Sequence, residues 1–460
     1  MDAQNNDAVA PPDVAVARPR PIDRALHLFA DVRRGEGWIA ILLTLNVFLL
    51  LTAYYLLKVA REPLILVSGA ETKSYAAAGQ ALVLIPVLKL YDALARRVGR
   101  MKLISTVSLF FCFNLLVFVL LSRLQVPLGV AFYLWVGVFS VMVVAQFWSF
   151  ANDIYTPEQG KRLFAILGIG SSVGAVAGTR IAKSLFPPLG PYGLMLVAAG
   201  ILLVCLALFW IVDRRMGTSF CRGGLRLKPK EPFGKAGGFQ LLFGERYLLL
   251  VGALAILRNW VNTVGEYVLD RILLHNAAEH TSSTVSFTQY VASFKADYFG
   301  WVNSVEVLVQ LFLVSRIIKY VGITGALLVL PLISLTGNLG LSFFPILALS
   351  LTAKVSENSV DYSLQSTAGN SLFLIVTRDA KYKAKAVIDT FLVRVGDVLS
   401  AAGVWLGGVL GAKTAHFTAL NVVLSLAWLG LVLVLGQEYR RYLAYPGPVD
   451  RSIPGATAAA

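Results

Sequence analysis

Apolar segments of about 20 residues, the length that crosses a lipid bilayer as a helix, recur along the whole chain between short polar connections. Of the 460 residues, 57% are hydrophobic and 15% are charged, whereas about 25% of the residues in soluble domains are charged. A soluble globule cannot remove so much apolar surface from water. The pattern therefore excludes a soluble enzyme and a disordered protein.

The apolar runs are too long for strands and do not alternate, so we expect an all-α polytopic membrane protein with twelve transmembrane helices in two six-helix bundles. The first six predicted helices cover residues 38–59, 75–95, 103–121, 129–151, 163–186 and 192–212. The other six start near Tyr247, Phe294, Ile323, Pro345, Ala384 and Phe417, and the last ends near Gly436. The predicted domains are a disordered and amphipathic tail (1–37), the two bundles (38–212 and 247–436), a basic linker (213–246) and a C-terminal tail (437–460).

The formal net charge of +15 is concentrated in every second connection between predicted helices. The positive-inside rule then places both termini and the linker in the cytoplasm. We expect a multi-pass protein of a bacterial inner membrane, with lipid and not nucleic acid as the partner of this basic surface.

The sequence lacks the motifs of cofactor and enzyme chemistry, and it contains glycine patterns that are typical of close helix packing. The chain has no P-loop, no metal-ligand spacing of histidine or cysteine and no catalytic triad, so we predict no cofactor, no metal and no enzyme. Glycines spaced by four predict close contacts between membrane helices. They fall in the fifth and eleventh predicted helices, at Gly170, Gly174 and Gly178 and at Gly403, Gly407 and Gly411.

The tenth predicted helix carries a polar stripe in its membrane segment. Lys354, Glu357, Asn358 and Asp361 share one helical face. Lys354 lies about 14 Å from the helix start at 1.5 Å per residue. Ionisable groups at such depth usually face a cavity or a partner. The stripe predicts either the wall of a translocation pathway or a self-neutralising structural pair.

The seventh predicted helix has a similar stripe, Arg258, Asn262 and Glu266, at intervals of four residues. We expect Arg258 and Glu266 to line a cavity. Asp270 and Arg271, which follow, are expected at a solvated helix end.

Other charged residues leave two interpretations open. Lys58 and Arg61, late in the first helix, fit either an anion-attracting vestibule or side chains that extend to the outer membrane interface. Glu306, a mid-span carboxylate, is a candidate proton-coupling site or a structural group. Arg180 and Lys183 are expected to extend to the outer interface.

Glycine-containing basic turns occur at matching places in the two halves. The first reads Arg97-x-Gly99-Arg100-x-Lys102, and the second contains Arg316, Lys319 and Gly322. A basic, glycine-containing turn at the same place in each six-helix half suggests an internal repeat. This plan of six plus six helices resembles the major facilitator superfamily.

Longer strings resemble the nucleotide (ATP/ADP) translocases of plastids and intracellular bacteria. They are LKVAREPL at 57–64 with SGAE at 68–71, FWSFAN at 147–152 with KRLF at 161–164, and YSL at 362–364 with YKAKAVIDT at 382–390. The matches occur in both halves and in the family's order.

The resemblance implies an antiporter that exchanges nucleotides by alternating access and uses charged residues of helices 1, 4, 7 and 10. The family's basic residue of helix 1 falls on Arg61 and its acidic residue of helix 7 on Glu266. The acidic residue of helix 4 falls on Tyr133, and a Lys-Glu pair falls on Gly369-Asn370, so two charged positions are neutral here. The string that contains Asn152 adds this residue to the candidate substrate-binding set, and Lys58, Arg258 and Lys354 are candidates to compensate for the missing charge.

We therefore expect a secondary transporter of a nucleotide or a related anionic metabolite. Two alternatives remain: a proton-coupled transporter of another organic solute, in which Glu306, Glu357 or Asp361 carries the proton, and a non-transporting membrane scaffold or sensor.

Overall fold

A computed structural model describes residues 37–155, 157–217, 237–281, 286–377 and 380–444. The predicted N-terminal tail up to residue 36, with its amphipathic part, lies outside these ranges. So do residues 218–236 of the predicted linker and the predicted C-terminal tail from residue 445.

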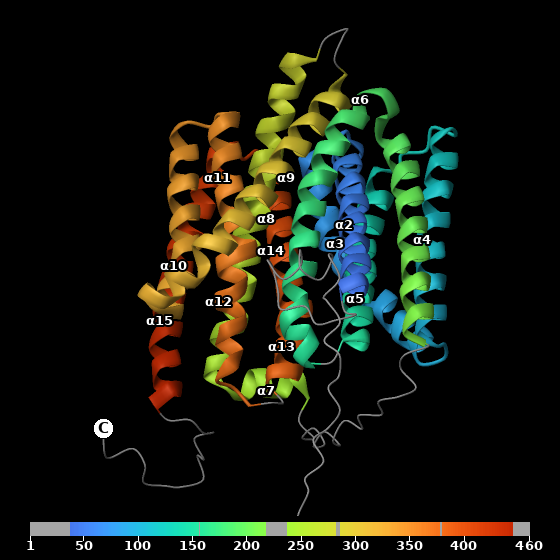
Figure 1. The fold of residues 1–460 in the computed structure, drawn as a ribbon. Helices are drawn as coiled ribbons and strands as arrows, with labels where there is room; N and C mark the ends of the chain where they lie inside the picture. The colour runs from blue at the N-terminus through green and yellow to red at the C-terminus, as the bar shows by residue number, and fades with distance from the viewer. Residues whose placement is uncertain (1–36, 156, 218–236, 282–285, 378–379, 445–460) are drawn as a thin grey trace, which may run out of the picture.

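Five helices form the N-terminal half, which lies beside the C-terminal half (Figure 1). In chain order they are α2 (Gly37–Leu66), α3 (Ala70–Ala95), α4 (Arg100–Ser122), α5 (Gly129–Ile154) and α6 (Pro157–Gly217). Gly190, with φ 66°, interrupts α6 beside Pro188 and Pro191. This turn divides α6 into the two spans that the sequence predicts, because only glycine adopts a positive φ without strain.

The C-terminal half begins with a short helix and contains six further spans. The elements are α7 (Gly238–Gly244), α8 (Arg246–His280), α9 (Phe287–Phe312), α10 (Val314–Phe343), α11 (Leu347–Val360), α12 (Ser366–Ser371), α13 (Lys385–Val387), α14 (Val393–Val409) and α15 (Thr414–Ala444). A π-helical segment, η2 (Asp361–Gln365), joins α11 to α12, and a 3₁₀ turn, η3 (Leu372–Leu374), follows. Two more π-helical segments, η4 (Ala380–Ala384) and η5 (Ile388–Leu392), flank α13.

The described residues thus form twelve spans in two halves and contain no strand, which confirms the predicted fold class. Eight of the described helices are long and apolar enough to cross a membrane by themselves, and one of them is the divided α6. The remaining spans, α9 and the interrupted α11–α12 and α13–α14, are shorter in single elements or carry more charge. The chain is a multi-pass membrane protein.

Several observed boundaries differ from the predicted ones. Helix α2 continues seven residues beyond Val59, and α9 begins at Phe287, seven residues before Phe294. The turns added to α2 contain Arg61 and Glu62, whereas the residues added to α9, 287–293, are uncharged. Glu62 is fully buried, so the charged residues after Val59 do not mark the end of this span.

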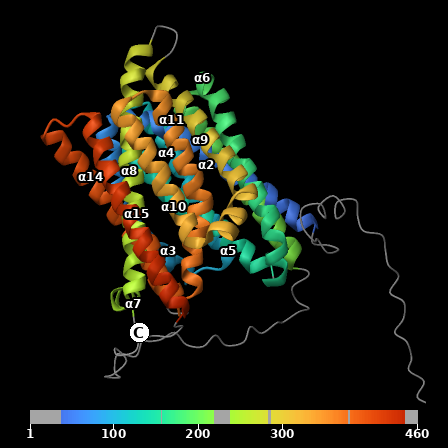
Figure 2. The same ribbon diagram turned by 90° about the vertical axis from the view of Figure 1, so that its left-hand side faces the viewer.

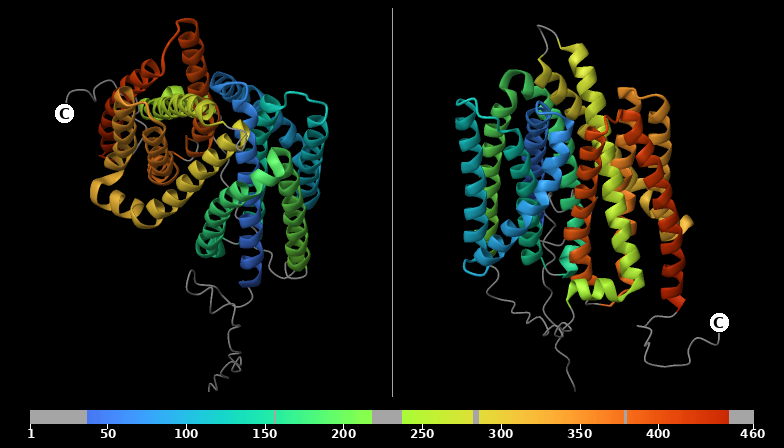
Figure 3. Two further views of the ribbon diagram at one scale, coloured as in Figure 1. Left: turned by 90° about the horizontal axis from the view of Figure 1, so that it is seen from above. Right: turned by 180° about the vertical axis from the view of Figure 1, so that it is seen from behind.

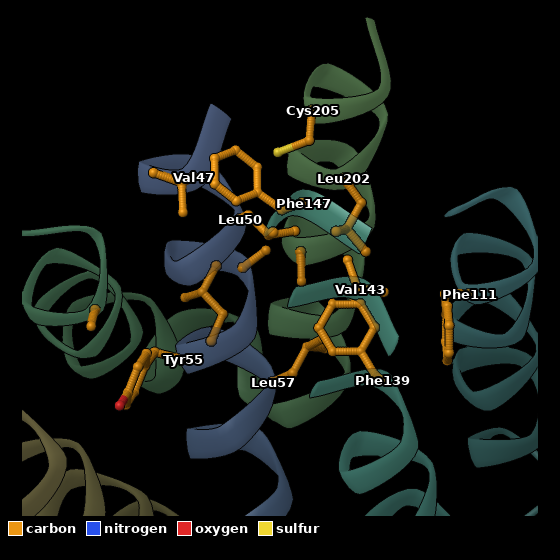
Figure 4. Packing of buried hydrophobic residues seen from close by; sticks show 14 of the residues in the cluster. Val47, Leu50, Tyr55, Leu57, Phe111, Phe139, Val143, Phe147, Leu202 and Cys205 are labelled. Carbon is orange, nitrogen blue, oxygen red and sulfur yellow. The ribbon is translucent and has the colours of Figure 1, made fainter. Parts of the chain in front are cut away.

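The core of the N-terminal half forms around α2, which packs on α5 and on α6, including the glycine-rich part of α6. Figure 4 shows Leu50 and Leu57 of α2 among aromatic side chains of α5, including Phe139 and Phe147. These apolar side chains fill the interior of this half.

The predicted glycine contacts are confirmed in one half and mostly wrong in the other. A Cβ at Gly174 would lie 2.3 Å from the Phe48 carbonyl oxygen, and one at Gly178 would lie 2.8 Å from the Thr52 carbonyl oxygen. By contrast, a Cβ at Gly403 or Gly411 would meet nothing within 4 Å. Gly411 has φ +65° and follows the end of α14. This glycine therefore allows the turn after the helix and does not make a helix contact.

The two halves meet through α2, α3 and α6 on one side and α8, α9 and α14 on the other. Seen from above in Figure 3, the two groups of helices lie against each other along this interface. Figure 2 shows α7 and the C-terminal end of α15 at the same end of the helices. The end of α8 and the start of α9 lie at the opposite end (Figure 1).

Candidate functional site

A cavity of about 210 Å³ lies between the two halves. The N-terminal half contributes side chains from α2, α3 and α5, and the C-terminal half contributes side chains from α8, α9, α11, η2 and α14. Its ionisable lining consists of four cations and four carboxylates: Lys58, Arg61, Lys73, Arg394, Glu62, Glu266, Asp270 and Asp397. Tyrosine, asparagine and threonine side chains complete much of the wall.

A central ion-pair cluster, Glu62, Lys73, Asp270 and Lys295, joins the halves at one side of this cavity. The Lys73 Nζ lies 2.6 Å from Glu62 Oε2 and 2.7 Å from Asp270 Oδ2, so one lysine of α3 links α2 to α8. The Lys295 Nζ of α9 lies 2.5 Å from Asp270 Oδ1 and 3.9 Å from Glu62 Oε2. All four side chains are buried. Burial of charges is tolerated here because each group has an opposite charge beside it.

The cluster lies away from the ends of its helices. Asp270 lies ten residues before the end of α8, which is about 15 Å at 1.5 Å per residue. Lys295 lies eight residues after the start of α9, which is about 12 Å. The cluster therefore lies at least two helical turns from the nearer ends of α8 and α9.

A second polar group surrounds Glu266 in the C-terminal half. The Tyr298 hydroxyl donates a hydrogen bond to Glu266, and the Asn358 amide donates another at 3.0 Å. The Lys354 Nζ lies 4.0 Å from Glu266, and it donates to Asn262 Oδ1 and Glu357 Oε2, each at 2.8 Å. These contacts orient Glu266 at the cavity wall.

Lys58 and Arg61, one turn apart on α2, differ in their partners. The Arg61 guanidinium lies 2.6 Å from Glu62 Oε1 and 4.4 Å from the centre of the Tyr133 ring. The Lys58 Nζ lies 4.2 Å from the centre of the Phe299 ring and 5.2 Å from that of Tyr55. Within the described part of the chain, no ion pair or hydrogen bond is found for Lys58, and its nearest partners are aromatic faces.

A second cavity of about 320 Å³ lies within the C-terminal half, next to Arg258. Gly369 and Asn370, the neutral residues at which the resemblance implies a charged pair, line it. Arg258 also pairs with Asp361 at 3.2 Å. The predicted stripes of α8 and α11 therefore meet each other in this region.

The structure brings most of the predicted substrate-binding residues together. Lys58, Arg61, Tyr133, Glu266 and Asn358 line the main cavity. Behind them, Lys354 pairs with Glu357 at 2.8 Å.

Two predicted residues lie elsewhere. Asn152 is exposed near the end of α5 and does not line the cavity. Its string includes the packing residues Phe147 and Phe150, so the resemblance there reflects helix packing. Glu306 is half-buried on α9 and does not line the cavity either.

Other charged residues were misjudged or missed in the sequence. Asp270 was expected at a solvated end, but α8 continues ten residues beyond it and its side chain is buried. Arg180 and Lys183, expected to extend to the outer interface, are 55% and 41% exposed, and both also pair with Asp297 of α9, at 3.7 Å and 2.6 Å. Extending the stripe of Arg258, Asn262 and Glu266 by four residues would have found Asp270. No sequence pattern distinguishes Lys73 or Lys295, as a buried residue of the site, from other lysines of the chain.

Comparison with known proteins relates this arrangement to a family. Residues 130–357 match the model of the TLC ATP/ADP transporter family. The chain is similar to the ATP/ADP translocases over this region. This confirms the resemblance seen in the sequence, and the family is one of transporters and not of enzymes.

The individual similarities agree with this relationship. The chain is 24% identical over 339 residues to ADP,ATP carrier protein 1 of Chlamydia pneumoniae, covering 63% of each chain. It is 24% identical over 336 residues to the chloroplastic ADP,ATP carrier protein 1 of Arabidopsis thaliana, covering 65% of this chain and 52% of that protein. The match thus spans less than two thirds of these relatives' length.

Solved structures show the same fold. The POT family transporter PepTSo has a TM-score of 0.65 at 12% identity, with 88% of this chain and 98% of that chain covered. The nucleoside transporter NupG has a TM-score of 0.58 at 11% identity, with 88% and 99% covered. The predicted fold class of the major facilitator type is confirmed.

Proposed function

We propose that this protein is a secondary transporter that works by alternating access and exchanges anionic metabolites, with nucleotides as the first class to test. The carrying observation is the charged cavity between the halves, because a substrate there would contact both. Two bundles that rock around such a site would expose it to each side in turn. The printed names of the relatives, ADP,ATP carriers, motivate the choice of nucleotides.

Counterflow in proteoliposomes tests this proposal. Vesicles with purified protein are loaded with unlabelled ADP, and uptake of labelled ADP or ATP is compared with that of protein-free vesicles. Exchange predicts uptake that depends on internal substrate. Absence of counterflow with nucleotides and with the other anions described below would contradict the proposed function.

A matched pair of α8 variants tests whether the cavity is the site. Glu266→Gln removes a charge from the cavity wall, where Asn358 and Lys354 orient the carboxylate. Glu279→Gln changes the same residue type on the same helix, but this side chain is exposed and pairs only with His275 at 3.4 Å within the described residues. We expect Glu266→Gln to lower exchange at least tenfold and Glu279→Gln to leave it unchanged.

Orientation and domain movement belong to the same proposal. We place both termini and the basic linker in the cytoplasm of a bacterial cell, with residues 38–212 and 247–436 as the moving bundles and lipid around them. A cysteine at Arg441 should react only with a membrane-permeant thiol reagent in intact cells, whereas a cysteine at Glu279 should also react with an impermeant one. The reverse pattern would invert the topology.

A second candidate is proton-coupled transport through Glu306. It is favoured by one observation, the place of this carboxylate on α9, one turn from Asn303, which accepts a 2.7 Å hydrogen bond from Tyr55 beside Lys58. Uptake without internal substrate that collapses on addition of a proton uncoupler would support this candidate over exchange.

A further inference from the structure

The charges around the main cavity constrain the charge of its substrate. We propose that the site is built for a substrate that carries a single net negative charge, which Lys58 binds. The inference rests on the proposed transport function and narrows it. A substrate with one negative charge would distinguish this chain from carriers of nucleoside di- and triphosphates, whose substrates carry more charge.

The lining itself is balanced, with four cations and four carboxylates. Directly behind it lie the cations Lys295 and Lys354 and one carboxylate, Glu357. Together these residues have one surplus positive charge. The pair of Arg258 and Asp361 leaves this surplus unchanged.

Pairing within this set identifies the residue that carries the surplus. Arg61, Lys73 and Arg394 each have a carboxylate within 3.0 Å. Lys295 and Lys354 have one at 2.5 Å and 2.8 Å. Lys58 alone among the described cations of the cavity faces only aromatic rings. An anion that enters can therefore pair with Lys58 without displacing a carboxylate.

Glu306 limits the surplus further. This carboxylate lies on α9 one turn from Asn303, which accepts a 2.7 Å hydrogen bond from Tyr55, the residue whose ring centre lies 5.2 Å from Lys58 Nζ. When Glu306 is ionised, the whole set is neutral. The site thus offers at most one uncompensated positive charge, whereas a nucleoside triphosphate in a low-dielectric cavity needs several.

The size of the cavity points the same way. Pockets for drug-sized ligands measure about 300–1,000 Å³, and this cavity measures about 210 Å³. The aromatic side chains around Lys58, including Tyr54 and Phe299, provide apolar surface for a small organic body. A small organic monoanion satisfies both the charge and the volume.

Two series of probes of increasing charge test the inference in the counterflow assay. One keeps the adenine group: adenosine, cyclic AMP, AMP, ADP and ATP. The other uses small carboxylates: lactate, malate and citrate. We expect the singly charged member of at least one series, cyclic AMP or lactate, to exchange best and the most highly charged members to exchange least.

Substitutions at Lys58 connect the preference to this residue. Lys58→Gln should raise the half-saturating concentration of the preferred monoanion about tenfold or more, while Lys58→Arg should retain most of the affinity. Lys89→Gln is the matched control, because Lys89 is an exposed lysine of α3 outside the cavity. Glu306→Gln should strengthen monoanion binding, since it removes the competing charge. Gel filtration confirms that each variant is folded.

The outcomes separate this inference from the proposed function. Robust counterflow with ADP or ATP preferred over every monoanion would overturn the inference and leave the transport function standing. The same holds for a monoanion preference that Lys58→Gln does not change. No counterflow with any probe would overturn both.

Discussion

Asp270→Asn tests whether the central ion-pair cluster stabilises the fold. The substitution keeps the shape of the side chain and removes the carboxylate that lies 2.5 Å from Lys295 and 2.7 Å from Lys73. Lys73 then keeps Glu62 at 2.6 Å, but the closest carboxylates left to the fully buried Lys295 are at 3.9 Å. Breaking a buried pair costs about 3–5 kcal/mol. Because one of the two lysines keeps a close partner, we expect a loss near 3 kcal/mol.

The assay is unfolding of the purified protein in detergent, followed by the accessibility of its buried cysteines, Cys112 and Cys205. Asp270→Asn combined with Lys295→Met removes the stranded charge and should recover most of the lost stability. Asp153→Asn is the matched control, because this carboxylate is 58% exposed and lies 3.8 Å from Arg100, an arrangement worth at most about 1 kcal/mol. If Asp270→Asn is no less stable than Asp153→Asn, or if the double variant recovers nothing, the cluster does not stabilise the fold as argued.

Two further predictions concern contacts between helices. Gly174→Ala should sharply lower the yield of folded protein on gel filtration, because the new Cβ would lie 2.3 Å from a backbone oxygen of α2. The control, Gly168→Ala, should not lower the yield, because nothing lies within 4 Å of its new Cβ. Equal yields would contradict the close packing. Asp297→Asn should leave thermal stability nearly unchanged, because its partners Arg180 and Lys183 are 55% and 41% exposed and such pairs contribute at most about 1 kcal/mol. Since these pairs join α6 to α9, their loss should speed counterflow by up to about fivefold, and a slower rate would show that they do not hold the halves together.

The twelve spans follow from the sequence because hydrophobic length decides membrane crossing with little help from tertiary structure. The end of α2 does not follow, because the lysines that allow Glu62 to be buried come from other helices. The presence of a partner on another helix also decides which of the regularly spaced glycines make close contacts. The spacing at Gly174 and at Gly403 is alike, but only Gly174 has a helix against it.

The candidate site was only partly predictable. Polar stripes within one helix, such as Glu266 on α8 and Asn358 on α11, can be read from periodicity, and the structure brings these two within 3.0 Å. The cluster around Lys73 requires three helices from different parts of the chain to meet. No local pattern in α3 encodes that meeting.

The arrangement of the central cluster explains how buried charge can coexist with the proposed movement of the halves. Lys73 and Glu62 belong to the N-terminal half and lie 2.6 Å apart, while Lys295 and Asp270 belong to the C-terminal half and lie 2.5 Å apart. Separation of the halves would break the contact of Lys73 with Asp270 at 2.7 Å and that of Lys295 with Glu62 at 3.9 Å. Each lysine would still keep a carboxylate within its own half. Because no charge is left without a partner, the penalty for an unpaired buried ion does not arise. The contacts across the interface can therefore favour the joined state without preventing its opening.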